Sequence, residues 1–483
     1  RPMARFISLL TVFLTFAFFS SVAGNQPDTT TLIIVSANDM HAKIDNFPKL
    51  KALIDEIRQK NEYVLLVSAG DMFTGNPVVD QYPDKGFPMI DLMNKTGFDL
   101  GIFGNHEFDY GQETLKKRIE QAAFPLISAN FKSTDPEGIH PTPYKVFTMS
   151  NGLKVGFVSV IQLNPAGLPD SHPSKLTGIE FTNGLEKIRE FRYLRDSCHV
   201  FVGLTHLGFE DDVKLAEDLR EFDLILGGHS HTTVKNPVEY NGVLVMQAGS
   251  GLKNVSKITV KLVNGKVVSK KAETVSVVNY PGQDSILVKD VERYNDNKEL
   301  NQVIGVALND IDGSDELGSL MADGITHLDE ITVAFQNAGG IRIDKLAQGN
   351  ITIKDMYKLD PFGNEIILLR MNGLEIKSLI EESFNREKLI DLQVSGLTYR
   401  VFTGTDGKAA SIKLYLPDGS EADDNSVFAV GLSSYIVSSY NFSHRDEGKT
   451  LYTTTAQALI NFISERKEID YKGVKRAFTE PAR

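Results

Sequence analysis

The segment "GIFGNHEFDYG", residues 101–111, places four side chains that bind metals or transfer protons within five positions. These side chains are Asn105, His106, Glu107 and Asp109, and they follow a short apolar run. A turn that caps a helix would explain one such segment. Similar groups follow several other apolar runs, however, so the chemistry has to be judged from the whole set.

Metal-capable side chains follow five apolar runs in the first half of the chain. The runs are "TLIIVSA", "YVLLVSA", "LGIFG", "HVFVGLTH" and "FDLILGG", and the side chains at or beyond their ends are Asn38, Asp39, His41, Asp71, Asn105, His106, Asp109, His206, His229 and His231. In α/β sheets, ligands bind in the crevice outside the carboxyl ends of the strands, so we expect these side chains to converge. Mixed nitrogen and oxygen ligands suit Zn²⁺, Mn²⁺, Co²⁺ or iron rather than Ca²⁺. Because an aspartate can bridge two ions, the set predicts a two-metal site.

Strand-like and helix-like segments alternate up to about residue 270, as the positioning of this set requires. Between the first two runs, Leu50, Leu53, Ile54 and Ile57 share one face at helical spacing. Continuous apolar runs separated by amphipathic helices indicate sheets covered by helices. Residues 253–280 alternate like a hairpin around "VNGK".

Residues 279–300 predict a connector to a second unit, because a Pro-Gly pair that interrupts regular structure is followed by a polar helical stretch. This unit has strand-like segments and a helix whose predicted buried face is Ile376, Leu379, Ile380 and Phe384. A chain of 483 residues is too long for one core, so two domains are expected. The net charge of -12 argues against a nucleic-acid polymer or an anionic membrane as the partner. A metal or a local positive site can still hold a nucleotide.

The N-terminus has the pattern of a secretory signal peptide. Arg1 and Arg5 precede the apolar stretch "FISLLTVFLTFAFFS", and small residues near Ala23 offer a cleavage position. This stretch is shorter than the roughly 20 residues of a membrane-spanning helix, and no later segment resembles a membrane span. Residues 1–24 are therefore expected to direct export to the periplasm or the extracellular space. The single cysteine, Cys198, is expected to be a buried thiol.

The motifs "NDMH", "SAGD", "GNHEFD", "LTHLG" and "GGHSH", in this order, resemble those of the calcineurin-like metallophosphoesterases. Together with the two-part chain, "GNHEFDYG" is similar to the secreted 5′-nucleotidase family, which includes the bacterial periplasmic UDP-sugar hydrolase and ecto-5′-nucleotidase. The resemblance implies an α/β, two-domain fold. A metallophosphoesterase β-sandwich flanked by helices would occupy residues 30–280, a connector helix residues 281–300, and an α/β substrate-binding domain residues 301–483.

The resemblance also implies a role for each motif residue. Asp39, His41 and His231 would hold one divalent ion, Asn105, His206 and His229 the second, and Asp71 would bridge the two, with Zn, Mn or Co as the expected metals. His231 stands where several relatives carry an amide. His106 and Asp109 would form the catalytic dyad. Glu107 receives no role and is expected to be structural.

Three segments of the second unit resemble the substrate-binding segments of this family. "QNAGGIR" is similar to the family's N-G-G-G-I-R segment, "LDPFGNEI" to its Pro-Phe-Gly segment, and "SSYIVSSYNFSHRDEG" to its third segment. The implied substrate contacts are Asn337, Gly339, Gly340, Arg342, Phe362, Asn364, Tyr435 and Asn441, with Phe362 and Tyr435 on either side of the base. The third segment lacks the family's glycines and has Asn441 in place of an aspartate that binds the ribose hydroxyls. Without the glycines, the side chain of Tyr440 or Phe442 could enter the substrate pocket. "SDELGSLMAD" lacks an arginine that some relatives carry.

The function implied is that of an exported phosphohydrolase that removes the 5′-phosphate from nucleotides by in-line attack of metal-bound water. Nucleoside monophosphates would be the substrates, with UDP-sugars or nucleoside di- and triphosphates as further candidates. A 2′,3′-cyclic-nucleotide 2′-phosphodiesterase/3′-nucleotidase is an alternative made credible by the altered third segment, and a related sulfur-ester hydrolase is another. A catalytically dead nucleotide-binding protein is the alternative from a different class. A site divided between domains suggests rotation about the connector, and monomer and dimer both remain open.

Overall fold

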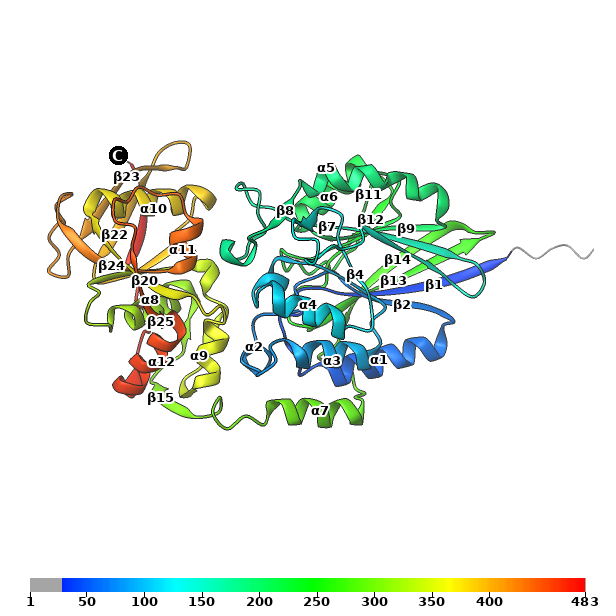
Figure 1. The fold of residues 1–483 in the computed structure, drawn as a ribbon, viewed down its shortest axis with the longest axis horizontal. Helices are drawn as coiled ribbons and strands as arrows, with labels where there is room; N and C mark the ends of the chain where they lie inside the picture. The colour runs from blue at the N-terminus through cyan, green and yellow to red at the C-terminus, as the bar shows by residue number, and fades with distance from the viewer. Residues whose placement is uncertain (1–27, 483) are drawn as a thin grey trace, which may run out of the picture.

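The computed structural model describes residues 28–482, so the predicted signal peptide lies outside the described residues. Figure 1 shows two bodies, one formed by the first part of the chain and the other by the second. Within residues 28–482, no helix has both the length and the apolar character needed to cross a membrane.

Two six-stranded sheets form the first body. The strand order is β14-β13-β1-β2-β3-β4 in one sheet and β11-β12-β10-β9-β7-β6 in the other. The first sheet consists of β1 Thr29–Ala37, β2 Tyr63–Ser68, β3 Leu100–Ile102, β4 Leu126–Ile127, β13 Asn254–Val263 and β14 Lys266–Ser276. The second consists of β6 Tyr144–Thr148, β7 Lys154–Ile161, β9 Val200–His206, β10 Leu224–Leu226, β11 Glu239–Tyr240 and β12 Val243–Met246. In both sheets the central strands are parallel, so their carboxyl ends face the same way.

The two sheets pack face to face around one apolar core. Leu32 and Ile34 of β1 lie in the same buried cluster as Phe157 of β7 and Val202 of β9. The helices cover the outer faces: α1 Phe47–Lys60, α3 Phe87–Thr96, α4 Gln112–Gln121 and α6 Phe209–Asp218, with the shorter helices α2 Pro77–Asp80 and α5 Gly184–Lys187. The predicted apolar face of α1 is buried, and the predicted hairpin is β13–β14. The α/β sandwich expected from the sequence is confirmed.

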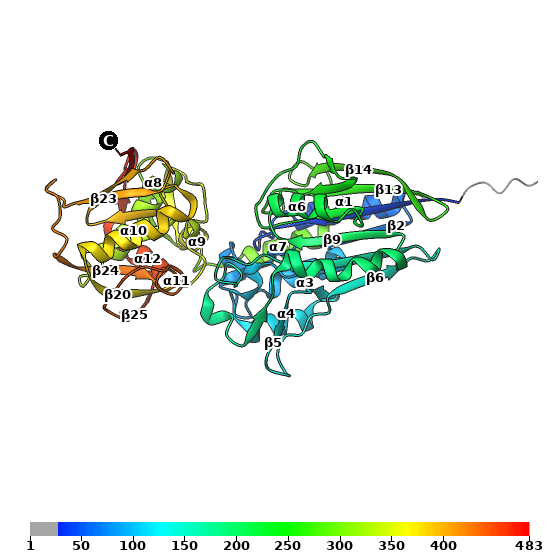
Figure 2. The same ribbon diagram turned by 90° about the horizontal axis from the view of Figure 1, so that it is seen from above.

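The second body is built around a five-stranded sheet with the order β21-β17-β24-β20-β25. Its strands are β17 Val333–Asn337, β20 Glu365–Asn372, β21 Leu392–Ser395, β24 Val427–Ser433 and β25 Lys449–Thr454. Helix α10, Gly373–Glu387, packs its predicted apolar face against Val333 and Phe335 on one side of the sheet. On the other side, Ile325 of α8 and Ala458 of α12 pack near Ala334. Helices α8 Gly313–Thr326 and α12 Thr455–Arg466 thus complete an α/β layer structure, seen from above in Figure 2.

Short elements surround this sheet. The small strands are β15 Val303–Ala307, β16 Ile311–Asp312, β18 Lys345–Leu346, β19 Gly349–Thr352, β22 Thr398–Thr403, β23 Ala409–Tyr415, β26 Glu468–Ile469 and β27 Ala477–Pro481, and the short helices are α9 Ile353–Leu359 and α11 Ser434–Ser439. In the first body, the remaining strands are β5 Phe131–Ser133 and β8 Ile179–Phe181.

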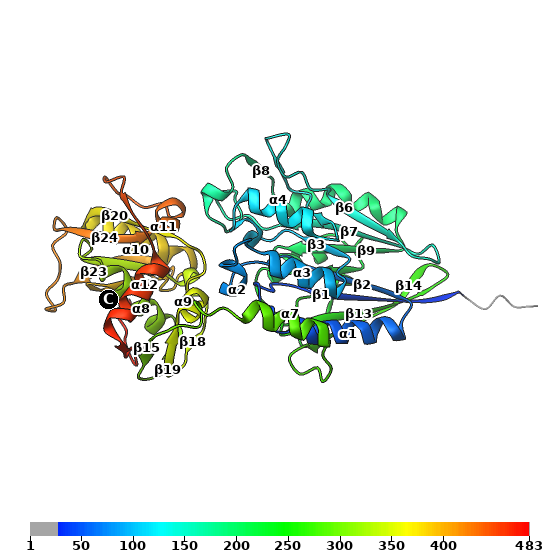
Figure 3. The same ribbon diagram turned by 60° about the horizontal axis from the view of Figure 1, so that its bottom comes forward.

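Helix α7, Ser285–Asn295, lies between the two groups of sheets in the sequence and packs on the first body. Asp284 caps its N-terminus, accepting from Ile286 N–H and Leu287 N–H. Tyr294 of α7 donates to Asp91 of α3 at 2.8 Å, and Figure 3 shows α7 beside α1 and α3. From this helix the chain crosses to β15 at the edge of the second body (Figure 1).

Candidate functional site

The carboxyl ends of the parallel strands bring the predicted metal-capable side chains to one edge of the first body, here called the metal edge. Asp39 and His41 follow β1, Asp71 follows β2, Asn105 to Asp109 form a 3₁₀ turn and its end after β3, His206 ends β9, and His229 and His231 follow β10. Their ligand-capable atoms lie within 4.8 Å of one another in three groups: Asp39, His41 and His231; Asp71, His206 and His229; and His41, Asp71 and His106. The first group contains the three residues implied for one ion. The second contains His206 and His229 of the other implied set together with Asp71, the implied bridge.

The first group presents imidazole nitrogens toward a common point. His41 Nδ1 donates to the carbonyl oxygen of Thr74 at 3.0 Å, which leaves the Nε2 lone pair free. That Nε2 lies 2.9 Å from Nε2 of His231, and the latter lies 3.5 Å from Oδ1 of Asp39. Burial and the charge of nearby Arg342 lower the pKa of His231 to about 4, so this imidazole is neutral. Neutral imidazole is the form that binds a metal.

The second group contains a buried nitrogen without a hydrogen-bond partner. His206 Nδ1 donates to the carbonyl oxygen of Ala69 at 2.8 Å, and its Nε2 lies 3.0 Å from Oδ2 of Asp71 without a hydrogen bond. Burial favours the neutral ring, but the carboxylates of Asp71 and Asp39 outweigh it and raise the pKa of His206 to about 10. The two carboxylates therefore stabilise a positive charge at the position of His206. A divalent cation between an imidazole lone pair and a carboxylate would supply this charge, so the donors present fit a metal.

Asn105 and His229 complete the second group. Asn105 Oδ1 lies 3.1 Å from Nδ1 of His229, while its Nδ2 donates to the carbonyl oxygen of Asp170 at 2.9 Å. The amide oxygen is thus directed toward the group. Burial and the charge of His206 lower the pKa of His229 to about 3, which keeps this imidazole neutral as well.

The backbone of the metal edge is held in a conformation that non-glycine residues rarely adopt. The positive φ angles are 48° at Asp39, 47° at His41, 54° at Asp71, 83° at His229 and 55° at His231. Such residues cost of order 1–3 kcal/mol each and cluster at functional sites. The surrounding contacts must therefore hold them in place.

Glu107 provides much of this hold. It is fully buried, and its carboxylate accepts hydrogen bonds from the main-chain N–H groups of Asp71, Met72 and Gly104. A side chain at Gly104 would place Cβ 2.2 Å from Oδ1 of Asp71, so only glycine fits beside that carboxylate. These contacts agree with the structural role expected for Glu107.

The predicted dyad is formed within a single turn. His106 Nδ1 lies 2.6 Å from Oδ2 of Asp109, and Oδ1 of Asp109 accepts from the hydroxyl of Ser171 at 2.8 Å. Burial alone would lower the pKa of His106, but the carboxylates of Asp109 and Asp71 outweigh it and raise the pKa above its ordinary value. The two carboxylates thus stabilise the imidazolium form relative to an isolated histidine.

Two predicted substrate residues of the second body reach the dyad. The ring of Phe362 stacks on His106, with 5.8 Å between centroids and 23° between planes. The guanidinium of Arg342 lies 5.6 Å from the centroid of Phe362. In this structure Phe362 therefore contacts the imidazole of the other body, a contact that the sequence did not predict.

The remaining predicted substrate residues lie on neighbouring loops of the second body. Asn337 is buried at the end of β17, and Gly339 and Gly340 lie in the turn that follows. Asn364 accepts from Thr455 N–H through its main-chain oxygen. Tyr435 is half-buried in α11, whereas Asn441 is exposed, and its main-chain N–H donates to Glu382 of α10 at 3.3 Å.

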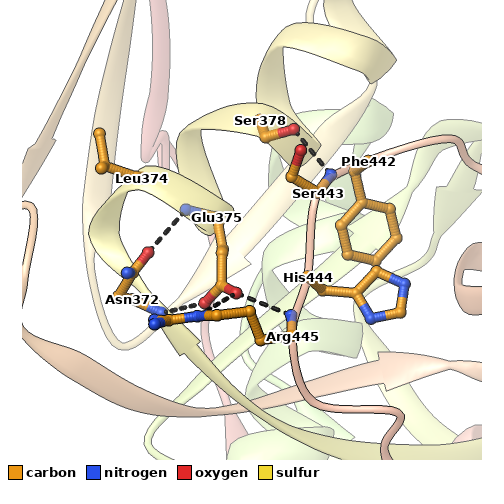
Figure 4. Close-up of a pocket in the computed structure, with 8 residues that line it drawn as sticks. All are labelled: Asn372, Leu374, Glu375, Ser378, Phe442, Ser443, His444 and Arg445. Atoms are coloured by element: carbon orange, nitrogen blue, oxygen red, sulfur yellow. Dashed lines mark hydrogen bonds and ion pairs between the residues drawn. The ribbon is translucent and has the colours of Figure 1, made fainter.

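Tyr440 and Phe442, which the sequence placed near the substrate pocket, are held in other contacts. Tyr440 donates to Asp391 at 2.6 Å and lies under the guanidinium of Arg386, 4.0 Å from it. Phe442 is buried under α10 and packs against His444. It lines a surface groove of about 560 Å³ between the start of α10 and the segment 442–445, shown in Figure 4. The segment after Tyr440 thus packs against α10.

Sequence reasoning missed Asp170 and Ser171, which contact Asn105 and Asp109. They lie in the loop after β7, the strand formed by "KVGFVSVI". The run ends at Ile161, and both residues lie further along the loop that follows it. The signal was available in principle, because β7 is parallel to β9 and ends at the same edge.

The comparisons with known proteins agree with this geometry. The calcineurin-like phosphoesterase model matches residues 33–233, and the model of the 5′-nucleotidase C-terminal domain matches residues 300–443. The first body is thus a metallophosphoesterase domain by fold and by site. The chain belongs to the family that combines this domain with a 5′-nucleotidase C-terminal domain.

Two relatives and one solved structure illustrate the similarity. The chain is 27% identical over 470 residues to endonuclease YhcR of Bacillus subtilis, covering 86% of this chain and 38% of that protein. It is 28% identical to the 5′-nucleotidase of Vibrio cholerae, covering 72% of this chain and 74% of the other. A 5′-nucleotidase precursor from Thermus thermophilus has the same fold, with a TM-score of 0.83, 24% identity, and coverage of 94% and 100%. The chain spans only about a third of the length of the two Bacillus subtilis proteins YhcR and YfkN.

Proposed function

We propose that this protein is a metal-dependent phosphohydrolase that removes the 5′-phosphate from nucleotides. The observation that carries the proposal is the convergence of seven metal-capable side chains beside a histidine–aspartate dyad. Two divalent ions, Zn, Mn or Co, would supply Lewis acidity that activates water and neutralises charge on the phosphate.

The chain's own residues would divide the work of binding. Asp39, His41 and His231 would hold one ion, Asn105, His206 and His229 the other, and Asp71 would contact both. The Nδ1–Oδ2 contact with Asp109 orients His106 so that its protonated Nε2 can donate to a phosphoryl oxygen or to the leaving oxygen. Arg342, directed toward the dyad from the second body, would pair with the phosphate.

The nucleoside would bind to the second body. Phe362 and Tyr435 would clamp the base, while Asn337, Gly339, Gly340, Asn364 and Asn441 would contact the rest of the nucleoside. Because Phe362 stacks on His106 in this structure, a bound base would require the second body to shift, which supports rotation about residues 282–300. A disulfide engineered across the two bodies would test the rotation. Undiminished turnover in the locked protein would rule it out.

A substrate panel tests the proposed activity. The metal-loaded protein should hydrolyse 5′-AMP faster than 3′-AMP, 2′,3′-cyclic AMP or UDP-glucose, and a chelator should abolish the reaction. The exposed Asn441 in place of a ribose-gripping aspartate favours a second candidate, the cyclic phosphodiesterase/3′-nucleotidase. A higher rate on 2′,3′-cyclic AMP would select it. A metal-loaded protein that hydrolyses none of the four would instead be a nucleotide-binding protein.

Export is proposed from the signal-peptide pattern of residues 1–24 alone. Expression of the full chain in a bacterium, followed by release of the periplasm and N-terminal sequencing, tests it. A mature N-terminus near residue 24 in the periplasmic fraction is expected, and an uncleaved protein retained in the cytosol would contradict it.

A further inference from the structure

We propose that Asp170 and Ser171, two consecutive residues of the loop after β7, position the second metal group and the dyad. Neither residue is assigned a role by the family resemblance. The inference rests on the proposed function for the identity of the metal edge, but the contacts of Asp170 can be tested without turnover. Both residues would be positioning residues, since they act through Asn105, His229 and Asp109.

The main chain of Asp170 fixes the orientation of Asn105. An asparagine amide has one acceptor oxygen and one donor nitrogen, and either can face a site. Here Nδ2 of Asn105 donates to the carbonyl oxygen of Asp170 at 2.9 Å. The oxygen Oδ1 is therefore directed toward Nδ1 of His229, at 3.1 Å, where a cation needs an oxygen.

The carboxylate of Asp170 acts on His229 from the other side of the ring. Its Oδ2 lies 3.7 Å from Nε2 of His229, while its Oδ1 accepts from Nδ2 of Asn164 at 3.3 Å. Because Nδ1 of His229 faces Asn105, a carboxylate opposite Nε2 favours a proton on Nε2 and a lone pair on Nδ1. Histidines that bind metals usually donate their other N–H to such a partner, which fixes the tautomer and raises the basicity of the ligand. At 3.7 Å this contact is electrostatic, within reach of a bridging water.

Ser171 performs the corresponding task for the dyad. It is buried, and its hydroxyl donates to Oδ1 of Asp109 at 2.8 Å, while Oδ2 of the same carboxylate lies 2.6 Å from Nδ1 of His106. With one oxygen bound to each partner, the carboxylate cannot rotate without losing a hydrogen bond. The orientation of His106 thus depends on a residue that is not next to it in the sequence.

The loop that carries both residues is itself braced. Asn164 accepts from Gly167 N–H through its main-chain oxygen, and its N–H donates to the carbonyl oxygen of Leu168 at 2.8 Å. Its side-chain oxygen accepts from Ala166 N–H at 2.9 Å. These contacts form a compact turn, so a loop of ordinary sequence can hold two side chains in fixed positions.

The test of Asp170 is a Mn²⁺ titration of the full protein, followed by electron paramagnetic resonance. Wild-type protein should bind two ions and show the spin-coupled signal of a pair. Asp170→Ala and Asp170→Asn should weaken one of the two ions by about 10–100-fold, the usual effect of losing such a partner, and leave the other unchanged. Asp170→Glu should restore part of the affinity. Asp135→Asn, at an exposed loop position of the same body, is the matched control and should bind as wild type.

The test of Ser171 compares kcat with KM. Ser171→Ala should bind both ions normally and lower kcat with little change in KM, whereas Ser174→Ala, an exposed serine nearby, should leave both unchanged. Each variant is compared by thermal unfolding of the metal-free protein, and Asp170→Asn serves if Asp170→Ala does not fold.

The outcomes separate the inference from the proposed function. Two ions bound with wild-type affinity in both Asp170→Ala and Asp170→Asn would overturn the inference for Asp170, and an unchanged kcat in Ser171→Ala would overturn it for Ser171. Wild-type protein that binds fewer than two Mn²⁺ ions would also overturn it. Protein that binds two ions, loses one on substitution of Asp170 and hydrolyses no phosphoester would support the inference and reject the proposed function.

Discussion

The metal edge of the first body and the substrate-facing loops of the second body are built in different ways. The metal edge follows directly from strand ends. Asp71 N–H donates to the Glu107 carboxylate, and the rings of His41 and His206 donate to the carbonyl oxygens of Thr74 and Ala69. The substrate-facing residues lie on a turn, a loop and the short helix α11, and several are half-buried or exposed. The part expected to do chemistry is thus buried and fixed by hydrogen bonds, whereas the part expected to recognise the nucleoside lies on more exposed loops.

The third substrate segment is held by contacts within the second body. Tyr440 donates to Asp391 and lies beneath Arg386, and Phe442 is buried in the apolar core under α10. At the metal edge, by contrast, the backbone itself lies close to the ligand side chains. A Cβ added at Gly104 would lie 2.2 Å from Oδ1 of Asp71, and one added at Gly228 would lie 2.9 Å from Nδ1 of His206.

The most severe test of the comparison is removal of the shared carboxylate. Asp71→Ala should abolish metal binding and hydrolysis together, because both metal groups include or adjoin Asp71. The loss of affinity should exceed the about 100-fold effect of losing an outer partner. Metal content by elemental analysis and initial rates on 5′-AMP provide the measurement.

The control for this substitution is Asp55→Asn, which removes a carboxylate from the surface of α1. It should leave metal content and rate unchanged. Normal metal content with a normal rate in Asp71→Ala would show that the edge is not a metal centre.

Substitution of the dyad histidine should separate chemistry from metal binding. His106→Asn should retain both ions and slow turnover by roughly 10²–10⁴, the effect of losing a general acid or base. Loss of an ion in this variant would instead place His106 among the metal ligands, as its proximity to His41 and Asp71 permits. Metal content and kcat, measured on the same preparation, decide between these results.

A substitution among the substrate-facing residues of the second body should act on binding. Tyr435→Ala should raise KM by about 5–150-fold with a smaller change in kcat, since stacking of a base on an aromatic ring contributes about 1–3 kcal/mol. Tyr452→Ala, at a tyrosine that is 85% exposed, is the matched control and should leave KM unchanged. An unchanged KM in Tyr435→Ala would mean that the base binds elsewhere.

The smallest expected effect concerns the fold of the second body rather than its site. Burial alone would raise the pKa of Asp323, but hydrogen bonds from Arg476 at 2.6 and 2.9 Å and from Tyr471 hold it below its ordinary value. A carboxylate with a lowered pKa stabilises the fold above its unfolded pKa of about 3.9. This stabilisation is lost as the pH falls through the still lower pKa of the folded state.

Asp323→Asn should therefore reduce the free energy of unfolding by about 1–3 kcal/mol at pH 7, and the difference from wild type should shrink below about pH 4. Denaturant unfolding at pH 7 and at pH 3 measures both values. Asp310→Asn, which breaks an exposed pair with Lys345, should change little at either pH. A difference that is equal at both pH values would show that the charge of Asp323 does not contribute.

Much of the metal edge could be predicted from the sequence, because residues that follow parallel strands in the chain lie at the same edge of the sheet. Residues as far apart as Asp39 and His229 are brought together, with His229 N–H donating to the Asp39 carboxylate, because both follow strands that end at one edge. The helical spacing of apolar residues likewise predicted the buried faces of α1 and α10.

What could not be predicted depends on loops and on the arrangement of the two bodies. The contact of Asp170 with Asn105 requires the path of a loop with no periodic pattern, and the stack of Phe362 on His106 requires the relative position of the bodies. Neither is encoded in spacing along the chain. Tyr435 was expected beside the base, but its surroundings follow from the packing of α11.

The left-handed backbone at five metal-edge residues has a consequence for attempts to make this protein more heat-resistant. Glycine alone would relieve the steric cost at Asp39, His41, Asp71, His229 and His231, and glycine carries no group that coordinates a cation. Substitutions that raise the free energy of unfolding of the metal-free protein at these positions are thus expected to abolish metal binding. A screen that rewards folding without demanding turnover would be expected to accumulate inactive, more durable variants at this edge first.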